Sequence, residues 1–330
     1  MGIAPDNLIG LPCVVLGGGG FIGTNLCKAL VERGAHVQAF GRSRNFPTAL
    51  DGVSWISGSF SDHAALARAL EGNEVVFHLI GGNTPASSNM DPAADLSTSA
   101  LNTIHMLEMC RASGVRKVIF VSSGGTVYGV LNQTPIPETA PTNPISAYGI
   151  SKLVVEKYLG LYEHLYGLDY CVLRVANPFG PYQTAVKKQG VIAAMVEKAL
   201  AGETLEVWGT GEVIRDFIHV TDVVNALITA VGYSGPHKVF NVGCGIGHSI
   251  NQIIGDLEAI LGDGRIKKLY KPVRQADVPI NVLDIQLIHR EMGWTPKVDW
   301  MEALRETIAW MMEMRGASLP TNLHDTPCHS

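Results

Sequence analysis

Two residues four positions apart combine a phenol with an ammonium group. Tyr148 and Lys152 stand in the run Tyr148-Gly149-Ile150-Ser151-Lys152, at the start of a segment with a helical pattern. That spacing places both side chains on one face of a helix. A free phenol has a pKa of about 10, and an adjacent cation favours its phenolate. We therefore expect Tyr148 to exchange a proton with a sugar or alcohol hydroxyl.

A hydroxyl-bearing segment precedes this pair. Ser122-Ser123-Gly124-Gly125-Thr126 directly follows the apolar run Val118-Ile119-Phe120-Val121, which has the length of a buried strand. Its hydroxyls can meet the phenol at the carboxyl end of a sheet. On its own, a Tyr-x-x-x-Lys spacing is more typical of a solvated helix face, and the amino terminus changes that interpretation.

The amino-terminal part of the chain has a glycine-rich turn between a strand and a helix. Cys13-Val14-Val15-Leu16 predicts a short buried strand, and a helical pattern runs from Thr24 towards Gly34. Between them, Gly17, Gly20 and Gly23 permit a tight turn, close approach to a pyrophosphate and close packing of helix on sheet. The helix amino terminus supplies N–H groups and a positive dipole end for phosphates. This pattern predicts a dinucleotide-binding site.

With these motifs in this order, the chain resembles an extended short-chain dehydrogenase/reductase of the nucleotide-sugar epimerase and dehydratase group, similar to UDP-glucose 4-epimerases. The resemblance runs from about Leu11 to Met314. Further matching segments are 58–62 (GSFSD), 76–79 (VFHL), 174–181 (RVANPFGP), 215–222 (RDFIHVTD), 241–243 (NVG) and 274–277 (RQAD).

The alternation of strand and helix patterns predicts an α/β fold, a Rossmann-type doubly wound parallel sheet covered on both faces. A smaller, sequence-interleaved lobe is expected to bind the substrate. We expect the dinucleotide-binding domain at 11–175, with 214–231 and 241–262 returning to it, and helices at 216–230 and 250–261. The remaining pieces, 176–213, 232–240 and 263–315, are assigned mainly to the substrate lobe, and 316–330 to a mobile tail.

The resemblance assigns roles to the catalytic and cofactor residues. It implies that Tyr148 removes the proton of a sugar 4-hydroxyl while hydride leaves C4 for a nicotinamide, and that the 4-ketosugar then turns over and takes hydride back. Lys152 also contacts the nicotinamide ribose. The implied cofactor contacts are Gly17, Gly20, Phe21, Ile22, Gly23, Ser59, Phe60, Leu79 and Lys152.

One position departs from the pattern of such epimerases, which commonly place Ser or Thr third in the hydroxyl segment. Here that position is Gly124. Because glycine has no hydroxyl, we expect Ser123 and Thr126 jointly to supply the hydrogen bond to the sugar.

The choice between NAD and NADP depends on the end of the second predicted strand. An acidic residue there usually meets a free ribose 2′-hydroxyl. This chain has Gly41-Arg42-Ser43-Arg44 instead. Guanidinium groups pair well with phosphate oxygens, so Arg42 and Arg44 favour NADP. Tight binding of NAD through other contacts is the alternative.

Substrate contacts are also implied by the resemblance. Arg215 and Arg274 match arginines that bind a nucleotide diphosphate, with ion pairing to Asp216, Asp222 or Asp277 as the alternative. Asn177 matches a residue that hydrogen-bonds the diphosphate-sugar. Trp208 falls where an aromatic ring packs near the nucleobase, or is a buried core residue. Asn281 stands where some hexose epimerases have a large aromatic residue, so an N-acetylated or carboxylated sugar is expected to fit.

Composition narrows the class of protein. The chain has 330 residues, 46% of them hydrophobic, and a formal charge of −5, so it has ample core and no basic character suited to nucleic acid. No apolar stretch reaches the ~20 residues of a membrane span, and no leader pattern precedes the first strand, so a cytoplasmic location is expected. The scattered cysteines and histidines indicate reduced packing residues and no metal site.

Two predicted helices, 95–113 and 148–166, carry apolar residues beyond one core-facing stripe, including Leu101, Leu107, Val154 and Leu161. In proteins of this kind the two helices form an intersubunit four-helix bundle. The resemblance therefore implies a homodimer. The alternative is that the extra apolar residues face their own sheet.

The resulting hypothesis is a nucleotide-sugar 4-epimerase, most simply acting on a UDP-hexose. A reductase of a nucleotide 4-ketosugar that uses NADPH is the runner-up. A 4,6-dehydratase fits less well, because such enzymes carry an Asp-Glu pair where this chain has Gly125 and Thr126. A non-catalytic dinucleotide-sensing protein would not need both Tyr148 and Lys152.

Overall fold

Seven parallel strands form the main sheet of the computed structural model, which describes residues 8–81, 84–184, 190–262, 264–272 and 278–316. The strands lie in the order β10-β6-β5-β4-β1-β2-β3. Their bounds are β1 Pro12–Leu16, β2 His36–Gly41, β3 Ser54–Ser57, β4 Val75–His78, β5 Lys117–Ser123, β6 Asp169–Val175 and β10 Val239–Val242. From β1 the chain first moves outward through β2 and β3, then returns to β4 and continues in the other direction. The strand order therefore reverses between β1 and β4, where this kind of sheet binds its ligands.

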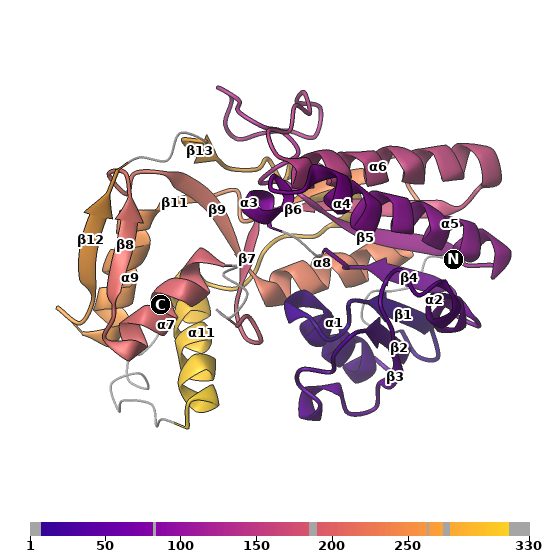
Figure 1. Cartoon of the computed structure of the whole chain (residues 1–330), viewed down its shortest axis with the longest axis horizontal. Coiled ribbons are helices and arrows are strands. Elements are labelled where there is room, and N and C mark those ends of the chain that lie inside the picture. The colour runs from indigo at the N-terminus through magenta and orange to yellow at the C-terminus, as the bar shows by residue number, and fades with distance from the viewer. Residues whose placement is uncertain (1–7, 82–83, 185–189, 263, 273–277, 317–330) are drawn as a thin grey trace.

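Helices cover both faces of this sheet (Figure 1). One face packs against α1 (Phe21–Glu32) and α8 (Val220–Gly232), through buried residues such as Leu26 and Val223. The other packs against α2 (His63–Leu70), α5 (Asn102–Ala112) and α6 (Ala147–Tyr166), through residues such as Leu66, Met106 and Val155. The central strands are buried on both sides, which explains their nearly continuous apolar sequences. The predicted doubly wound α/β fold is confirmed.

A smaller group of elements, the smaller lobe, lies beside this sheet (Figure 1). Strand β9 pairs antiparallel with β11 and parallel with β13 and β7, and β8 pairs parallel with β12. The strands are β7 Asn177–Phe179, β8 Thr204–Trp208, β9 Ile214–His219, β11 Gly247–Ser249, β12 Lys267–Lys271 and β13 Ile280–Asn281. Helices α7 (Val191–Ala201), α9 (Ile250–Leu261) and α11 (Trp300–Met314) share an apolar core with them.

Short helices and capping residues set the remaining path of the chain. α3 (Pro85–Ser88), α4 (Pro92–Leu96) and a π-helical turn (Ser97–Leu101) lead into α5, whereas the sequence predicted one helix over 95–113. α10 (Gln286–Met292) precedes α11. Ser146 caps α6 by accepting the N–H of Gly149, and Gly167 ends that helix with a positive φ of 71°. No helix within the described ranges combines the length and apolar character that crossing a membrane requires.

The structure differs from the expected division of the chain at several elements. Residues 214–219, expected partly as helix, form β9, because Phe217 and Ile218 alternate between the smaller-lobe core and the core beneath α8. The whole of β10 lies in the seven-stranded sheet, although its first two residues were assigned to the smaller lobe. Helix α9 has the expected bounds but packs in the smaller-lobe core. The division into two lobes stays a prediction, with these elements reassigned.

Candidate active site

The glycine turn connects β1 to α1 in a conformation that side chains would obstruct. Gly17 has a φ of +91°, and the N–H of Gly20 donates to its carbonyl oxygen at 3.0 Å. A Cβ added at Gly23 would lie 2.2 Å from that oxygen, so this glycine permits close packing of helix on turn. Gly19, which the sequence analysis did not single out, is equally restricted, because an added Cβ would lie 2.0 Å from the carbonyl oxygen of Ser43.

The amino terminus of α1 is available to an anion. Its capping residue Gly20 has no side chain to accept the first N–H groups, and the first turn contains no acidic residue. The first helical N–H groups have no acceptor within the helix and carry the positive end of its dipole. The residues present therefore fit a dinucleotide pyrophosphate at this turn.

The phenol and ammonium groups lie at the carboxyl end of β5, as their spacing predicts. Lys152 Nζ donates to the carbonyl oxygen of Val121 at 2.8 Å, lies 5.7 Å from the ring centroid of Tyr148 and sits over the ring of Phe120 at 4.6 Å. The Tyr148 side chain is hydrogen-bonded to Ser123. Lys152 is only 3% exposed, so its charge is held inside the protein.

Burial changes the pKa values of both groups. It raises the pKa of Tyr148 to about 12, assisted by the Asp95 carboxylate and opposed by the hydrogen bond with Ser123. It lowers the pKa of Lys152 to about 8, against the opposing effects of Glu156 and Asp95. The expectation of a phenol acidified by its neighbouring cation is therefore wrong for the protein alone, because loss of water around the phenolate and the nearby Asp95 carboxylate both raise the pKa of Tyr148.

The glycine at position 124 has a spatial explanation. A Cβ added there would lie 2.5 Å from Leu283 Cδ1 and 3.0 Å from the carbonyl oxygen of Arg174. Leu283 therefore occupies the space that a serine or threonine would need. Of the two hydroxyls expected to compensate, Ser123 contacts Tyr148, whereas Thr126 Oγ1 is buried with no hydrogen-bond partner in the described part of the chain.

The two arginines expected at a 2′-phosphate lie in different surroundings. Arg44 Nη2 donates to the carbonyl oxygens of Leu50 at 2.6 Å and Pro47 at 3.4 Å, so this side chain is bound to its own loop. Arg42 is exposed at the end of β2.

The remaining predicted cofactor residues lie near the carboxyl ends of the strands. Phe21 and Ile22 begin α1, and Leu79 donates its N–H to the carbonyl oxygen of Leu16. Phe60 is buried against His78, with ring centroids 5.2 Å apart. Contact of Phe60 with a cofactor would therefore involve its backbone.

The predicted substrate residues belong mainly to the β7–β9–β13 sheet. Asn177 Nδ2 donates to the carbonyl oxygen of Asp216 at 2.8 Å, and Arg215 Nη1 donates to that of Ile214 at 2.9 Å. Asn281 stands opposite Arg215 in the sheet register. Its Nδ2 donates to the carbonyl oxygen of Gly124 at 3.3 Å, and its buried Oδ1 has no partner among the described residues.

The other predictions about substrate residues differ in their outcomes. Trp208 is 37% exposed at the end of β8, so the alternative of a buried core tryptophan is wrong. Asp216 accepts N–H groups of Cys244, Gly245 and Leu283, which shows that its carboxylate anchors loops. Arg274 and Asp277 lie outside the described residues.

The sequence analysis missed three buried charged residues around Lys152. Asp95 accepts a hydrogen bond from Ser151 Oγ at 2.7 Å, and Glu156 is paired with Arg174 at 2.6 Å. Two signals were available in the sequence. Glu156 follows Lys152 by one helical turn, and Arg174 interrupts an apolar strand, where a charge requires a partner.

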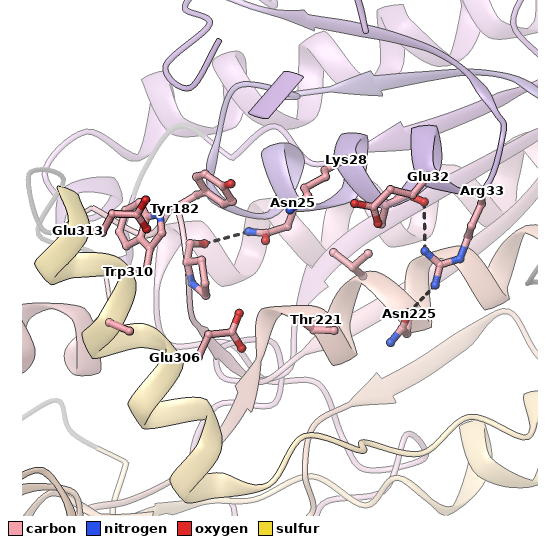
Figure 2. Close-up of a pocket in the computed structure, with 14 residues that line it drawn as sticks. Asn25, Lys28, Glu32, Arg33, Tyr182, Thr221, Asn225, Glu306, Trp310 and Glu313 are labelled. Atoms are coloured by element: carbon pink, nitrogen blue, oxygen red, sulfur yellow. Dashed lines mark hydrogen bonds between the residues drawn. The ribbon is translucent and has the colours of Figure 1, made fainter. Parts of the chain in front are cut away.

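A cavity of about 740 Å³ lies apart from these groups, between later turns of α1 and helices α8 and α11 (Figure 2). Asn25, Glu306 and Trp310 are among the residues lining it, and Asn25 Nδ2 donates to the carbonyl oxygen of Pro181 at 2.9 Å. Neither Tyr148 nor Lys152 lines it. Its place in the fold separates it from the proton-exchanging pair.

Comparison with known proteins agrees with this geometry. A family model described as NAD-dependent epimerase/dehydratase matches residues 13–243. A UDP-glucose 4-epimerase of Mycolicibacterium smegmatis is 33% identical over 303 residues, covering 89% of this chain and 96% of that protein. The structure of Thermotoga maritima UDP-glucose 4-epimerase with UDP-glucose has 36% identity and a TM-score of 0.87, covering 92% of this chain and 99% of that one. The Thermus thermophilus UDP-glucose 4-epimerase complex with NAD has 30% identity and a TM-score of 0.84, covering 93% and 99%.

The order of the motifs, the doubly wound sheet and the family match all concern the same residues. The match begins at β1, includes the glycine turn and the Tyr148–Lys152 pair, and ends just after β10. The chain belongs to the NAD-dependent epimerase/dehydratase family.

Proposed function

We propose that this protein is a nucleotide-sugar 4-epimerase acting on a UDP-hexose or a derivative of one. The observation that carries the proposal is the meeting of Tyr148, Ser123 and Lys152 at the carboxyl end of β5, beside a glycine turn that fits a dinucleotide. The Mycolicibacterium smegmatis relative and the Thermotoga maritima structure, each more than 30% identical over most of the chain, are UDP-glucose 4-epimerases, which supports the same reaction.

The chemistry divides between cofactor and protein. A bound nicotinamide cofactor supplies a reversible hydride acceptor for the sugar C4. Tyr148 takes the proton of the 4-hydroxyl and later returns it, with Ser123 sharing the hydrogen bond. Tyr148 must be a phenolate to take this proton, and the Lys152 ammonium would stabilise that form. Because burial raises the pKa of Tyr148 to about 12, the phenolate depends on such stabilisation.

The substrate part of the proposal concerns residues 177, 208, 215, 274 and 281. Asn177, Arg215 and Arg274 would contact the diphosphate, and the partly exposed Trp208 the base. Asn281 has a small side chain and an unpaired buried Oδ1, which can accept a hydrogen bond from an N-acetyl N–H or a sugar hydroxyl. Activity with UDP-glucose together with failure on UDP-N-acetylhexosamines would contradict the role of Asn281.

Cofactor specificity is proposed to depend on Arg42. Arg44 is bound to backbone carbonyls, whereas Arg42 is exposed where an acidic residue would meet the ribose. This position favours NADP. Denaturing the purified protein and identifying the released nucleotide tests the choice, and recovery of NAD without NADP would contradict it.

A homodimer is proposed through α6 and the helical segment before it. Five apolar side chains of these segments each have more than two fifths of their surface exposed: Ile150, Leu161 and Leu165 of α6, and Leu96 and Leu101 beside it. A second copy would cover these apolar side chains, as in the four-helix bundle that the family resemblance implies. Recovery of only monomer after cross-linking at micromolar concentration would contradict the proposal.

A panel of UDP-, dTDP-, GDP- and CDP-sugars tests the reaction itself. The product stereochemistry and the nicotinamide absorbance are followed together. Epimerisation without net change in absorbance is expected, and Tyr148→Phe should lose about 10²–10⁴-fold in kcat, because general acid–base catalysis contributes about that much. An active Tyr148→Phe variant would contradict the assigned role.

Adding a nucleotide 4-ketosugar and NADPH to this panel tests a second candidate, which Arg42 favours. A reductase of a nucleotide 4-ketosugar would consume NADPH in proportion to the product formed. Net oxidation of NADPH with a ketosugar, and no epimerisation of the parent sugar, would select the reductase.

A further inference from the structure

A chain of buried polar side chains begins beneath the proton-exchanging pair. Glu156, one helical turn after Lys152 on α6, accepts a hydrogen bond from Ser122 Oγ at 2.5 Å. Arg174 of β6 donates to the same carboxylate, from Nη2 at 2.6 Å and from Nε at 3.1 and 3.2 Å. One carboxylate therefore joins the catalytic helix to the ends of two neighbouring strands.

The chain of contacts continues towards the smaller lobe. Arg174 Nη1 donates to the Tyr128 hydroxyl at 3.0 Å, and that hydroxyl donates to Asn241 Oδ1 at 2.7 Å. Asn241 Nδ2 donates to the carbonyl oxygens of Ile136 at 2.9 Å and Asp284 at 3.1 Å. Asp284 is adjacent to Leu283, which packs against Gly124. We call Ser122, Glu156, Arg174, Tyr128 and Asn241 the Glu156 network.

We propose that Glu156 and Arg174 are positioning residues for the proton exchange. They hold α6 at one height and rotation on β5 and β6, so that Lys152 stays a cation beside Tyr148, and they connect this position to the loop that bears Leu283. The inference deepens the proposed function and rests on it for its kinetic consequences.

Burial and geometry support a positioning role over a purely structural one. Glu156 and Arg174 are almost fully buried, and their bidentate pairing fixes orientation as well as distance. If the carboxylate had only a structural role, a single cationic partner would be enough to compensate its buried charge. Here the carboxylate lies one turn from Lys152 and also binds Ser122, which belongs to the hydroxyl segment.

The charges around Lys152 make its protonation depend on Glu156. Tyr148 and Glu156 face it from α6, and Asp95 from α4. His78 faces it from β4, and its pKa is lowered to about 3 by burial and then by Lys152, so it is neutral and adds no charge.

From β5, Lys152 meets the ring of Phe120 and the carbonyl oxygen of Val121, neither of which is charged. Removing the Glu156 charge would leave Lys152 and Arg174 as two buried cations with Asp95 as the remaining carboxylate. The ammonium form of Lys152 should then lose its proton at lower pH.

Titration of Lys152 by NMR tests this without requiring any activity. The protein carries ¹³C-labelled lysine, and its Lys152 signal is identified by its loss in Lys152→Met. In the wild type it should titrate near pH 8, and in Glu156→Gln at lower pH. Glu163→Gln is the matched control on the same helix, where Glu163 pairs with Lys238 at 3.0 Å, and it should leave the titration unchanged.

The kinetic arm uses the same variants. In Glu156→Gln the alkaline limb of the kcat profile should move to lower pH with Lys152, while nucleotide affinity stays within twofold. Glu156→Asp keeps the negative charge on a shorter side chain. It should restore the position of the alkaline limb of the kcat profile but not the full kcat. A folded Glu156→Gln protein with the wild-type titration and the wild-type pH profile would overturn the proposal.

If Glu156→Gln does not fold, the Lys152 titration in Ser122→Ala provides the test. This substitution removes only the hydrogen bond to the carboxylate, so a smaller shift of the Lys152 titration towards higher pH is expected, because the freed carboxylate charge is less dispersed. An unchanged titration in this variant would overturn the proposal. If the wild type turns over no nucleotide sugar but the Lys152 titration shifts as expected, the proposed function fails and the positioning inference stands.

Discussion

Glu156 and Asp216 are both buried carboxylates, but their partners differ in kind. Glu156 is held by the guanidinium of Arg174 and the hydroxyl of Ser122. Asp216, on β9, is held by backbone N–H groups of Cys244 at 2.8 Å, Gly245 at 3.1 Å and Leu283 at 3.3 Å. We call these the Asp216 loop cluster. One carboxylate joins a helix to strands, and the other joins the segments that follow β10 and β13.

The difference shows what each arrangement can do. A cation supplies full charge compensation along a defined direction, so an ion pair can orient a helix that carries catalytic groups. Backbone amides compensate only partly, and burial raises the pKa of Asp216 to about 6 despite their hydrogen bonds. The contribution of the Asp216 loop cluster to stability should therefore change with pH near 6. An ion pair such as Glu156–Arg174 need not respond in that range.

The largest expected effect comes from removing the cation. Arg174→Met leaves the Glu156 carboxylate buried without its charge partner, which should lower the free energy of unfolding by about 3–5 kcal/mol. Chemical denaturation measures the change. The double variant Glu156→Leu/Arg174→Met should recover more than half of the loss, because no buried charge of the pair remains. A loss under ~1 kcal/mol in the single variant would show that the pair is not a close ionic contact.

A smaller effect is expected from pH at the Asp216 loop cluster. Because its pKa is raised from 3.8 to about 6 on folding, the folded state binds this proton more tightly than the unfolded state. The resulting stability is fully present below about pH 4 and is lost as pH rises through 6. Relative to Asp216→Asn, the wild type should gain ~2 kcal/mol in free energy of unfolding between pH 7 and pH 4.

Denaturation of both proteins at matched pH values isolates this contribution from other titrating groups. A constant difference between wild type and Asp216→Asn across that range would show that the Asp216 carboxylate keeps its usual pKa. The comparison of the two carboxylates would then lose its electrostatic basis.

The smallest expected effect is at the contact between the two regions. Gly124→Ser places a Cβ against Leu283, whose N–H binds Asp216, and against the carbonyl of Arg174. Overpacking of this kind should cost about 1–2 kcal/mol. Adding Leu283→Ala to Gly124→Ser should be less destabilising than adding it to the wild type, as thermal denaturation of the four proteins would show. Equal effects of Leu283→Ala in both backgrounds would mean that the two side chains do not compete for space.

Local signals predicted the fold and part of the site. The glycine turn, the Tyr148–Lys152 spacing and helix Ile250–Leu261 depend on neighbours within a few residues, so the sequence pattern contains them. The seven-stranded sheet followed from alternation of strands and helices. In contrast, the sequence predicted a helix from residue 216, and only pairing with β7, β11 and β13 makes residues 214–219 a strand.

The rest of the site depends on contacts between distant segments. No local pattern shows that Leu283 fills the space at Gly124, or that Arg174 finds Glu156. The direction of the Tyr148 pKa was also beyond the sequence, because spacing shows which charges are near but not how much water is excluded.

The path of the chain between the large sheet and the smaller lobe has a mechanical consequence. After β6 the chain leaves the large sheet for β7–β9, returns through α8 and β10, and leaves again for β11 and α9. Two lobes joined by one linker can rotate about a single hinge. Where the chain crosses between the lobes several times, every connecting segment must bend at once. Opening and closing around a bound molecule is therefore expected to involve small shifts of loops and side chains rather than wide rotation.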